Sequence, residues 1–505
     1  MGMIGFQVAG IGNSTAARVR SGAGKCRTSP GFGRVPSRKW RRSVAYDQLN
    51  PDESNPFERE VQTNVTPFPE VEEQMEITKS LEKPSGLSER LGVVFLTFLS
   101  FIICNMDRIN VSVAILPMRE YYGWSQGTVG IIQSAFFWGY ILTQIPGGYL
   151  ADKYGGKKVL SFGVVAWSLM TFITPIAASA SLPILLLARA LLGIGEGVAM
   201  PAMNSIISTW IPPNERSRSL SLIYSGMYMG SVIGLLTCPF LIQSFGWPSV
   251  FYVFGLIGIG WYGMWQIFIS PSPKESKTIT ESERKYILDR IPKKESKKLN
   301  KLSDIPWKKL FSSKHTWAII VAHFCCTWGY FVFLTWLPTY FNLELGFDFG
   351  KSAFVSILPW LSMFIFANAG GFIADFLYAN GLTLTKVRKL MQTIGFLGPA
   401  AFLGLTARTA DPILGVLFMT LALGLGSFSQ SGVYANHQDI GPEYSGILLG
   451  ISNTFAALPG IIGVALTGFI LEGTGSWDLV FGLAIGFYAL GTVVYNAFGT
   501  GERVF

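Results

Sequence analysis

The segment GGYLADKYGGKK, residues 147–158, decides the architecture, because a shortened copy of it recurs later in the chain. The copy is GGFIAD, residues 370–375, and the two copies end the second and the eighth of twelve long apolar runs. A second pair lies at a similar offset: NERSRS at 214–219 follows the fourth run, and PEYSG at 442–446 follows the tenth. Such internal repetition predicts two halves of six helices each.

The apolar runs indicate a membrane protein. The chain has 505 residues, of which 50% are hydrophobic and 14% charged, with a mean hydropathy of +0.39. A soluble chain would carry roughly a quarter charged residues. Each run is near the roughly 20 residues that span a bilayer as helix. The sequence therefore predicts an all-α polytopic membrane protein with twelve transmembrane helices, at residues 91–117, 126–150, 158–177, 183–209, 219–242, 248–270, 316–341, 351–377, 387–407, 411–434, 445–470 and 477–498.

The positive charge gathers at the N-terminus. Residues 1–46 hold nine Lys or Arg and no acid, and they are rich in Ser, Thr, Gly and Ala. This composition is typical of an organelle transit peptide, and a disordered basic tail is the alternative. Residues 47–90 hold eleven acids against four basic residues, with several prolines, which favours a disordered linker. Residues 47–505 taken together are balanced, with 31 basic and 31 acidic residues, and we expect no nucleic-acid partner.

The remaining charges predict the orientation. Loops after even-numbered runs carry most of the Lys and Arg of the short loops, and residues 271–314 add thirteen basic residues against six acids. By the positive-inside rule, both termini share the side of these loops. Within this connector, Thr280 opens a capping-box pattern ahead of a short amphipathic helix. The expected domains are thus a bundle at 91–270, the connector, a bundle at 315–500 and a tail at 501–505.

Nothing in the sequence indicates covalent catalysis. The five cysteines show no metal-type spacing, the three histidines are scattered, and neither a Walker loop nor a GxSxG elbow is present. We therefore expect neither an enzyme nor a bound cofactor.

Four charged residues lie inside apolar runs. LLLARALLGIGEGVAMP, residues 185–201, contains Arg189 and Glu196, which share a helix face about 10 Å apart. The first run adds Asp107 and Arg108. A charge at the bilayer centre costs about 2.5–3.5 kcal/mol, so all four should point inward. Two guanidiniums suit an anion, and two carboxylates could take up H⁺ or Na⁺. The alternative is a static network that braces the first and fourth helices.

The loop after the second run resembles a known motif. GYLADKYGGKK, residues 148–158, is similar to the G-x-x-x-D-[RK]-x-G-[RK]-[RK] loop of the major facilitator superfamily, with one additional residue after the second Gly. This resemblance implies that fold, in which two six-helix bundles rock about a central site. It also implies a conformational latch, with glycines that allow close helix approach and a tight turn, made by Gly148, Asp152, Lys153, Gly155, Lys157 and Lys158.

Three further segments resemble the anion:cation symporter family within that superfamily. They are FFWGYILTQIPGGYLAD (136–152), RALLGIGEGVAMPA (189–202) and ANHQDIGPEYSGILLGISN (435–453). The similarity runs from about residue 91 to residue 500, and with the basic N-terminus the chain is most like the plant plastidial type-4 phosphate transporters. This implies a single-chain secondary transporter in a plastid membrane, the inner envelope rather than the thylakoid.

The resemblance also implies site residues. For binding a small anion it gives Arg108, Arg189, Gln133, Tyr140, Tyr228 and Asn436, and for coupling to co-transported Na⁺ or H⁺ it gives Glu196 and Asp107. Packing between helices is the alternative role of the tyrosines and of Asn436.

Two departures from the vesicular glutamate transporters bear on the substrate. Gln133 replaces a histidine of those proteins, and Cys326 replaces a third arginine. We therefore expect inorganic phosphate and not glutamate, with an organic anion such as ascorbate as the alternative. A passive anion channel or a transporter-like receptor remains a different class of function.

Overall fold

The computed structural model describes residues 88–291, 306–441 and 444–505. The expected transit-like segment 1–46 and nearly all of the expected linker 47–90 lie outside these residues. In the N-terminal half, six predicted spans are occupied by α3 (Glu89–Tyr122), α4 (Gln126–Leu142) with α5 (Gln144–Tyr154), α6 (Gly156–Ala180), α7 (Leu182–Gly197) with α8 (Ala199–Trp210), α9 (Pro213–Phe245) and α10 (Pro248–Phe268).

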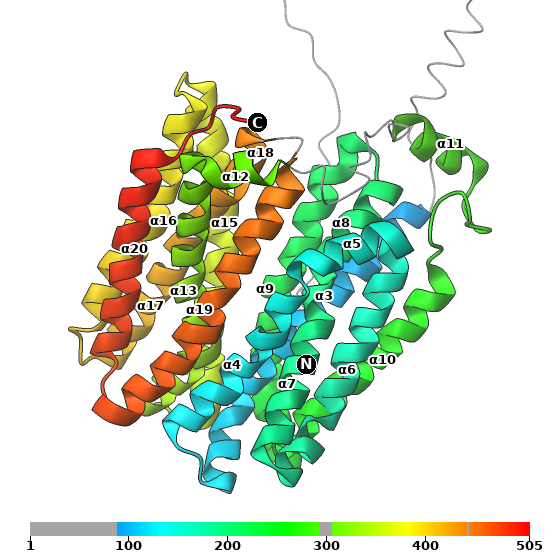
Figure 1. Ribbon diagram of the computed structural model, residues 1–505. Helices are drawn as coiled ribbons and strands as arrows, with labels where there is room; N and C mark the ends of the chain where they lie inside the picture. The colour runs from blue at the N-terminus through cyan, green and yellow to red at the C-terminus, as the bar shows by residue number, and fades with distance from the viewer. Residues whose placement is uncertain (1–87, 292–305, 442–443) are drawn as a thin grey trace, which may run out of the picture. The chain divides into compact units, whose positions relative to one another are not determined.

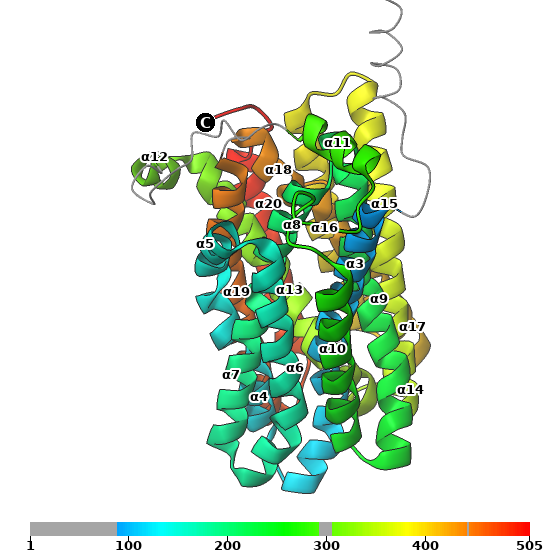
Figure 2. The same ribbon diagram turned by 90° about the vertical axis from the view of Figure 1, so that its right-hand side faces the viewer.

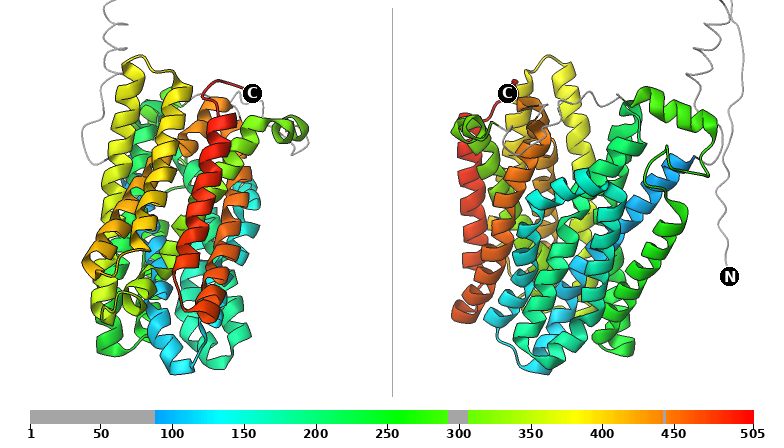
Figure 3. Two further views of the ribbon diagram at one scale, coloured as in Figure 1. Left: turned by 90° about the vertical axis from the view of Figure 1, so that its left-hand side faces the viewer. Right: turned by 45° about the vertical axis from the view of Figure 1, so that its right-hand side comes forward.

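The C-terminal half repeats this plan (Figures 1 and 3). Its spans are α13 (Lys314–Leu343), α14 (Phe349–Val355) with α15 (Ile357–Ala379), α16 (Leu384–Thr406), α17 (Pro412–Gly426) with the 3₁₀ turn η2 (Ser427–Gln430) and α18 (Val433–Ile440), α19 (Ser445–Thr474) and α20 (Asp478–Phe498). The connector carries α11 (Glu281–Arg290) and α12 (Trp307–Ser312), at the same end of the bundle as the C-terminus (Figure 1).

Four of the twelve predicted spans are interrupted helices, which the hydropathy pattern did not predict. Three interruptions have one cause, because proline cannot donate to the carbonyl four residues earlier. Pro146, Pro201 and Pro359 lie four residues after Leu142, Gly197 and Val355, which are the last residues of α4, α7 and α14. Other prolines, such as Pro175 in α6, lie inside helices that continue. In the tenth span, the glycine-rich stretch around η2 replaces the helix locally.

By length and composition, ten helical segments of the described residues are long and apolar enough to cross a membrane. Two predicted spans are not among these ten. One is α4 with α5, a helix broken after Leu142, and the other is α16, which carries Lys386, Arg388 and Lys389 near its start. Residues 214–219, expected as a loop, instead form the first turns of α9.

α7 packs against α4 and α6, which lie beside it in Figure 2, and glycines set this close approach. A Cβ on Gly193 would clash with the Phe136 carbonyl of α4 and lie 2.9 Å from the Tyr140 nitrogen. A Cβ on Gly195 would lie 2.9 Å from the Trp167 nitrogen of α6. Small residues allow such backbone contact between membrane helices. The two glycines that precede Glu196 thus place that carboxylate in the core of the N-terminal half.

The two halves meet at the end opposite the C-terminus. There α4 packs along α19, and a Cβ on Gly468 would lie 3.0 Å from the Gly130 Cα atom. The Glu472 carboxylate of α19 accepts hydrogen bonds from Ser125 Oγ at 2.8 Å and from the Gly127 nitrogen at 2.7 Å. A carboxylate at a helix N-terminus is favourable, because the first N–H groups lack partners within the helix. Glu472 therefore closes this end by capping a helix of the other half.

The connector helix α11 is held against the N-terminal half. Thr280 accepts a hydrogen bond from the Glu283 nitrogen, as its capping box predicts, and the buried Glu283 carboxylate pairs with Arg90 Nη1 of α3 at 3.1 Å. Arg90 Nε also pairs with Glu215 of α9 at 3.0 Å. These ion pairs join α11 to the first turns of two transmembrane helices.

Candidate functional site

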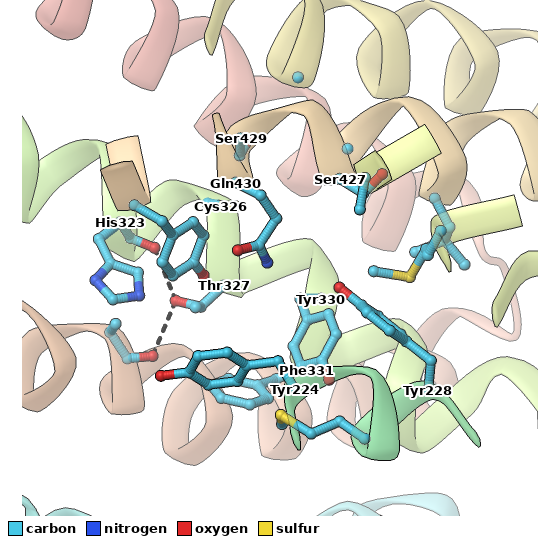
Figure 4. A pocket seen from close by; sticks show the side chains of 18 of the residues that line it. Tyr224, Tyr228, His323, Cys326, Thr327, Tyr330, Phe331, Ser427, Ser429 and Gln430 are labelled. Atoms are coloured by element: carbon cyan, nitrogen blue, oxygen red, sulfur yellow. Dashed lines mark hydrogen bonds between the residues drawn. The ribbon is translucent and has the colours of Figure 1, made fainter. Parts of the chain in front are cut away.

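A cavity of about 540 Å³ lies between the two halves, and both halves line it. Arg108 of α3, Tyr140 of α4 and Tyr228 of α9 line it from the N-terminal half. The C-terminal half contributes Tyr330 of α13 and Gln430 of η2, among others (Figure 4). Three of the residues predicted for anion binding, the arginine and the two tyrosines, therefore border one space.

The central interaction at this cavity is an ion pair between α3 and α7. Arg108 donates to Glu196 Oε2 from Nη2 at 2.7 Å and from Nε at 3.0 Å. Arg108 is 9% exposed and Glu196 1%. Both bonds end on one oxygen, so the pair lacks the two-oxygen fork geometry that makes arginine–carboxylate pairs strongest. Arg108 is thus held by a carboxylate behind it while it borders the cavity in front.

Two side chains that the sequence analysis assigned no role support this pair. Cys104, one helical turn before Arg108, contacts Glu196 Oε2 through its thiol at 3.4 Å. The ring centre of Phe136 lies 5.1 Å from the Arg108 Cζ atom and 5.9 Å from that of Arg189. A cation over an aromatic face is attracted by the ring quadrupole. The four-residue spacing places Cys104 on the same face of α3 as Arg108, and this was the sequence signal that Cys104 lies beside the ion pair.

Arg189 and Asp107 lie behind the cavity wall. Both are buried, at 3% and 0% exposure, and neither borders the cavity. Within the described residues, Nε and Nη1 of Arg189 and both carboxylate oxygens of Asp107 have no hydrogen-bond partner. Arg189 lies near the same Phe136 ring as Arg108, and Asp107 directly precedes Arg108 in α3. The four charged residues therefore lie in one region of the N-terminal half, and the ion pair among them joins Arg108 to Glu196.

The two predicted amides do not border the cavity in this conformation. Gln133 is 2% exposed in α4. Asn436 of α18 donates to the Thr500 carbonyl at 2.7 Å and to Asp439 Oδ2 at 3.4 Å. Asp439 in turn pairs with Arg388 of α16 at 2.6 Å. Asn436 thus belongs to contacts that hold the short helix α18 against the tail and α16.

The C-terminal wall of the cavity mixes apolar side chains with polar ones, and no carboxylate, lysine or arginine is among its described lining residues. It presents hydroxyl, amide, thiol and imidazole groups from Tyr330, Gln430, Ser429, Cys326 and His323, labelled in Figure 4. Arg108 is consequently the one arginine or lysine among the residues described around the cavity. An anion that enters would meet a cation on one side and neutral hydrogen-bonding groups on the other.

The predicted latch motif is partly described. Gly155 has φ +88° at the turn between α5 and α6, where L side chains are strained, so a glycine is required there. Gly148 does not make the expected close approach, because a Cβ there would meet nothing within 4 Å. Gly156 does so instead, since its Cβ would lie 2.6 Å from the Ala202 carbonyl oxygen.

The basic residues of the motif lie around that turn. Lys153 Nζ lies 5.2 Å from the Tyr154 ring centre, and Lys158 is exposed. The Lys157 carbonyl accepts a hydrogen bond from Ser161 Oγ at 2.8 Å. The side chain of Asp152 lies outside the described ones.

Comparisons with known proteins agree with this architecture. The family model described as Major Facilitator Superfamily matches residues 94–464. A D-xylose–proton symporter of known structure superposes with a TM-score of 0.67 at 13% identity, over 82% of this chain and all of that one. A bacterial homologue of the human lysosomal transporter Spinster, in an inward-facing and occupied conformation, gives a TM-score of 0.64 at 16% identity, over 82% of this chain and 97% of that one.

Several close relatives are plant proteins. The "Sodium-dependent phosphate transport protein 1, chloroplastic" of Arabidopsis thaliana is 54% identical over 82% of this chain and 80% of that protein. The "Ascorbate transporter, chloroplastic" of the same plant is 55% identical over 82% of this chain and 76% of that protein. The "Probable anion transporter 4, chloroplastic" of Oryza sativa subsp. japonica is 56% identical over 82% of this chain and 69% of that protein.

The matched family model covers most of the chain, the helices have that family's arrangement, and the relatives far exceed 30% identity. The protein therefore belongs to the major facilitator superfamily, among its plant chloroplastic anion transporters, and is a multi-pass membrane transporter and not an enzyme.

Proposed function

We propose that this protein is a secondary active transporter of inorganic phosphate across a plastid membrane, coupled to Na⁺ or H⁺. The observation that carries the proposal is the position of Arg108: it lines the cavity, and its counter-ion is a carboxylate of the protein, that of Glu196. The names of two relatives, a sodium-dependent phosphate transport protein and an ascorbate transporter, support an anion as cargo. The inner envelope is the proposed membrane, and the single chain is the proposed working unit.

The geometry suggests how anion and cation are coupled. With Glu196 ionised, its carboxylate occupies the guanidinium of Arg108, and an entering anion must compete with it. Neutralising Glu196 with a proton, or a cation bound beside it, weakens that hold and leaves Arg108 for the anion. Anion and cation then favour each other's binding, as symport requires. Arg189 and Asp107 act in this scheme as nearby charges that bias Glu196, without contacting the cargo in this conformation.

Alternating access follows from the two ends of the molecule. The end closed by Glu472 opens as the other end closes, by rocking of residues 91–270 against 315–500. The latch residues around Gly155 belong to the end that moves inward. In this picture the cavity stays central, and Arg108 and Tyr330 face the cargo from opposite halves.

A second cargo is favoured by the cavity itself. About 540 Å³ is more space than a phosphate ion needs, and the C-terminal wall offers neutral hydrogen-bonding groups such as Gln430, Tyr330 and Ser429. A hydroxyl-rich organic anion such as ascorbate would place its charge on Arg108 and its hydroxyls on that wall. Both cargoes use the same cation, so the wall residues decide between them.

Uptake into proteoliposomes tests the proposal. Labelled phosphate is supplied with an inward Na⁺ gradient, an inward H⁺ gradient or neither, to the wild type and to Arg108→Ala. We expect gradient-driven accumulation that is lost in Arg108→Ala, and the gradient that drives it identifies the coupling ion. Unlabelled ascorbate that competes strongly would favour the organic cargo. Passive equilibration without accumulation would indicate a channel, and binding without uptake a receptor.

A further inference from the structure

Two of the three histidines in the chain meet around one serine in the C-terminal half. Ser452 Oγ of α19 lies 3.1 Å from His323 Nδ1 of α13 and 2.7 Å from His437 Nε2 of α18. All three side chains are buried, at 2% exposure or less, and the two imidazole ring centres are 5.9 Å apart. In the sequence these two histidines are scattered, because 114 positions separate them. The fold brings them together.

Hydrogen-bond chemistry assigns the protons of this array. His437 Nδ1 lies 3.1 Å from the Tyr434 carbonyl oxygen, which can only accept, so this nitrogen carries a proton. In neutral His437 the other nitrogen, Nε2, is then an acceptor for the hydroxyl proton of Ser452. This contact is 2.7 Å long, shorter than the 3.1 Å from the same hydroxyl to the Leu449 carbonyl, so the proton is assigned to His437. The serine oxygen in turn accepts from Nδ1–H of His323. The neutral array therefore runs in one direction, with each group donating to the next from His323 to His437.

The array begins at the cavity. His323 borders the cavity described above, and Figure 4 shows its ring beside Thr327 and Cys326. Thr327 fixes the backbone there, since its hydroxyl lies 2.9 Å from both the His323 and the Ala456 carbonyl oxygens. His323 Nδ1 contacts Ser452 and carries the ring's proton in the neutral tautomer. The lone pair of the neutral ring is therefore on Nε2.

We propose that His323, Ser452 and His437 form a proton relay that loads one proton from the cavity onto His437. A proton binds Nε2 of His323, the Nδ1 proton of His323 passes to Ser452 Oγ, and the serine's original proton passes to Nε2 of His437. Three protons shift by one place each, and the net change is one proton taken up. His323 and Ser452 end neutral, and His437 ends as an imidazolium.

The end of the relay suits a positive charge. The imidazolium of His437 would donate from Nδ1 to the Tyr434 carbonyl and from Nε2 to Ser452, so both of its N–H groups have acceptors. His437 also lies in the last turn of α18, where the helix dipole favours a cation. A protonated His323 would have an assigned acceptor only at Ser452. The charge therefore rests on His437.

The neighbouring groups leave this site distinct from the Arg108–Glu196 pair. Cys326 and Tyr330 of α13 and Tyr228 of α9 are titratable side chains that line the same cavity as His323. Tyr434 packs edge-on to His323 with ring centres 4.7 Å apart. From α19 the group that faces the rings is the uncharged Ser452. On α18, Asp439 follows His437 by two residues, and its charge is matched by Arg388 of α16.

This inference rests on the proposed function for its purpose, since a proton held in the C-terminal half would add a second coupling site to Glu196. The C-terminal half contributes no arginine or lysine to the described lining of the cavity. A protonated His437 would give this half a cation, which is present only when protons are supplied. The anion would then lie between Arg108 and a charge that depends on the proton gradient.

Imidazole spectra test the relay directly. Full-length protein with ¹⁵N-histidine, reconstituted in lipid, gives signals from only three rings, which His323→Gln, His437→Gln and His315→Gln assign. Above neutral pH we expect His437 and His323 each to carry their proton on Nδ1. As the pH is lowered stepwise, His437 should become doubly protonated before His323. A His437 ring protonated on Nε2 alone, or a His323 ring that charges first, would overturn the proposal.

Transport provides the second readout, with the Na⁺ gradient held constant while the pH gradient is varied. We expect His437→Gln and Ser452→Ala to lose the proton-driven part of phosphate uptake, while exchange of internal for external phosphate at equal pH is retained. His315→Gln is the matched control, because that ring contacts the Phe498 carbonyl at the end of α20 and should leave both activities unchanged. If phosphate uptake driven by the pH gradient is unchanged in both relay variants, the inference is wrong. If wild-type protein exchanges no phosphate, the proposed cargo fails, and the imidazole spectra decide the relay on their own.

Discussion

Replacing Glu196 with glutamine should tighten anion binding and abolish accumulation at the same time. The substitution keeps the size of the side chain and removes its charge, so Arg108 loses a partner that it now holds at 2.7 and 3.0 Å. A hydrogen bond to a charged group contributes about 1.5–3 kcal/mol net, and 1.4 kcal/mol corresponds to a factor of about ten. An anion that no longer displaces a carboxylate should therefore bind roughly 10- to 100-fold more tightly.

The assay measures two quantities on the same protein. Equilibrium binding of labelled phosphate to purified Glu196→Gln gives the Kd, and proteoliposomes with an imposed cation gradient give the accumulation. Glu344→Gln removes an exposed carboxylate at the end of α13 and serves as the control. A static brace between α3 and α7 predicts the opposite pattern: lower thermal stability, no gain in affinity, and accumulation in proportion to the folded protein. That result would refute the competition between Glu196 and the anion.

Three other substitutions test separate parts of the account. Arg108→Lys keeps the charge but loses the planar fork, so phosphate Kd should rise by roughly 10- to 100-fold, and an unchanged Kd would remove Arg108 from the binding site. Gly193→Ala places a methyl group against the Phe136 carbonyl and should cost about 1–3 kcal/mol of stability. In the control Gly148→Ala the new methyl group meets no atom, so the unfolding temperature should stay unchanged or rise slightly. Equal losses of stability in the two variants would contradict the packing of α4 on α7. Glu472→Gln weakens an exposed helix cap by about 1 kcal/mol, which corresponds to a roughly fivefold larger population with that end open. Distances between spin labels at the ends of α4 and α19 measure this population. An unchanged distance distribution would show that Glu472 does not hold that end closed.

The sequence predicted the helices well because hydropathy is a property of each segment alone. Within the described residues, helices occupy all twelve predicted spans, and ten of these are long and apolar enough to cross a membrane. Their interruptions were missed, since three of the four depend on which carbonyl a proline leaves unpaired. Pro146, Pro201 and Pro359 give interruptions, whereas Pro175 lies in a helix that continues. Tertiary packing decides between these outcomes, and a single sequence does not contain it in readable form.

The candidate site was predicted in part for a similar reason. Burial cost alone indicated that Arg108 and Glu196 point inward, and the fold brings α3 and α7 close enough for them to pair. Which arginine borders the cavity depends on helix rotation, so Arg189 was expected there and lies behind the wall instead. The histidine–serine array was not anticipated, because its members come from α13, α18 and α19 and meet only in the folded chain.

A structure determined with phosphate at saturating concentration would test the central claim most directly. The account predicts anion density in the cavity within hydrogen-bonding distance of the Arg108 guanidinium, with the Glu196 carboxylate drawn away from it. Density elsewhere, with the Arg108–Glu196 pair still at its present 2.7 Å, would contradict it.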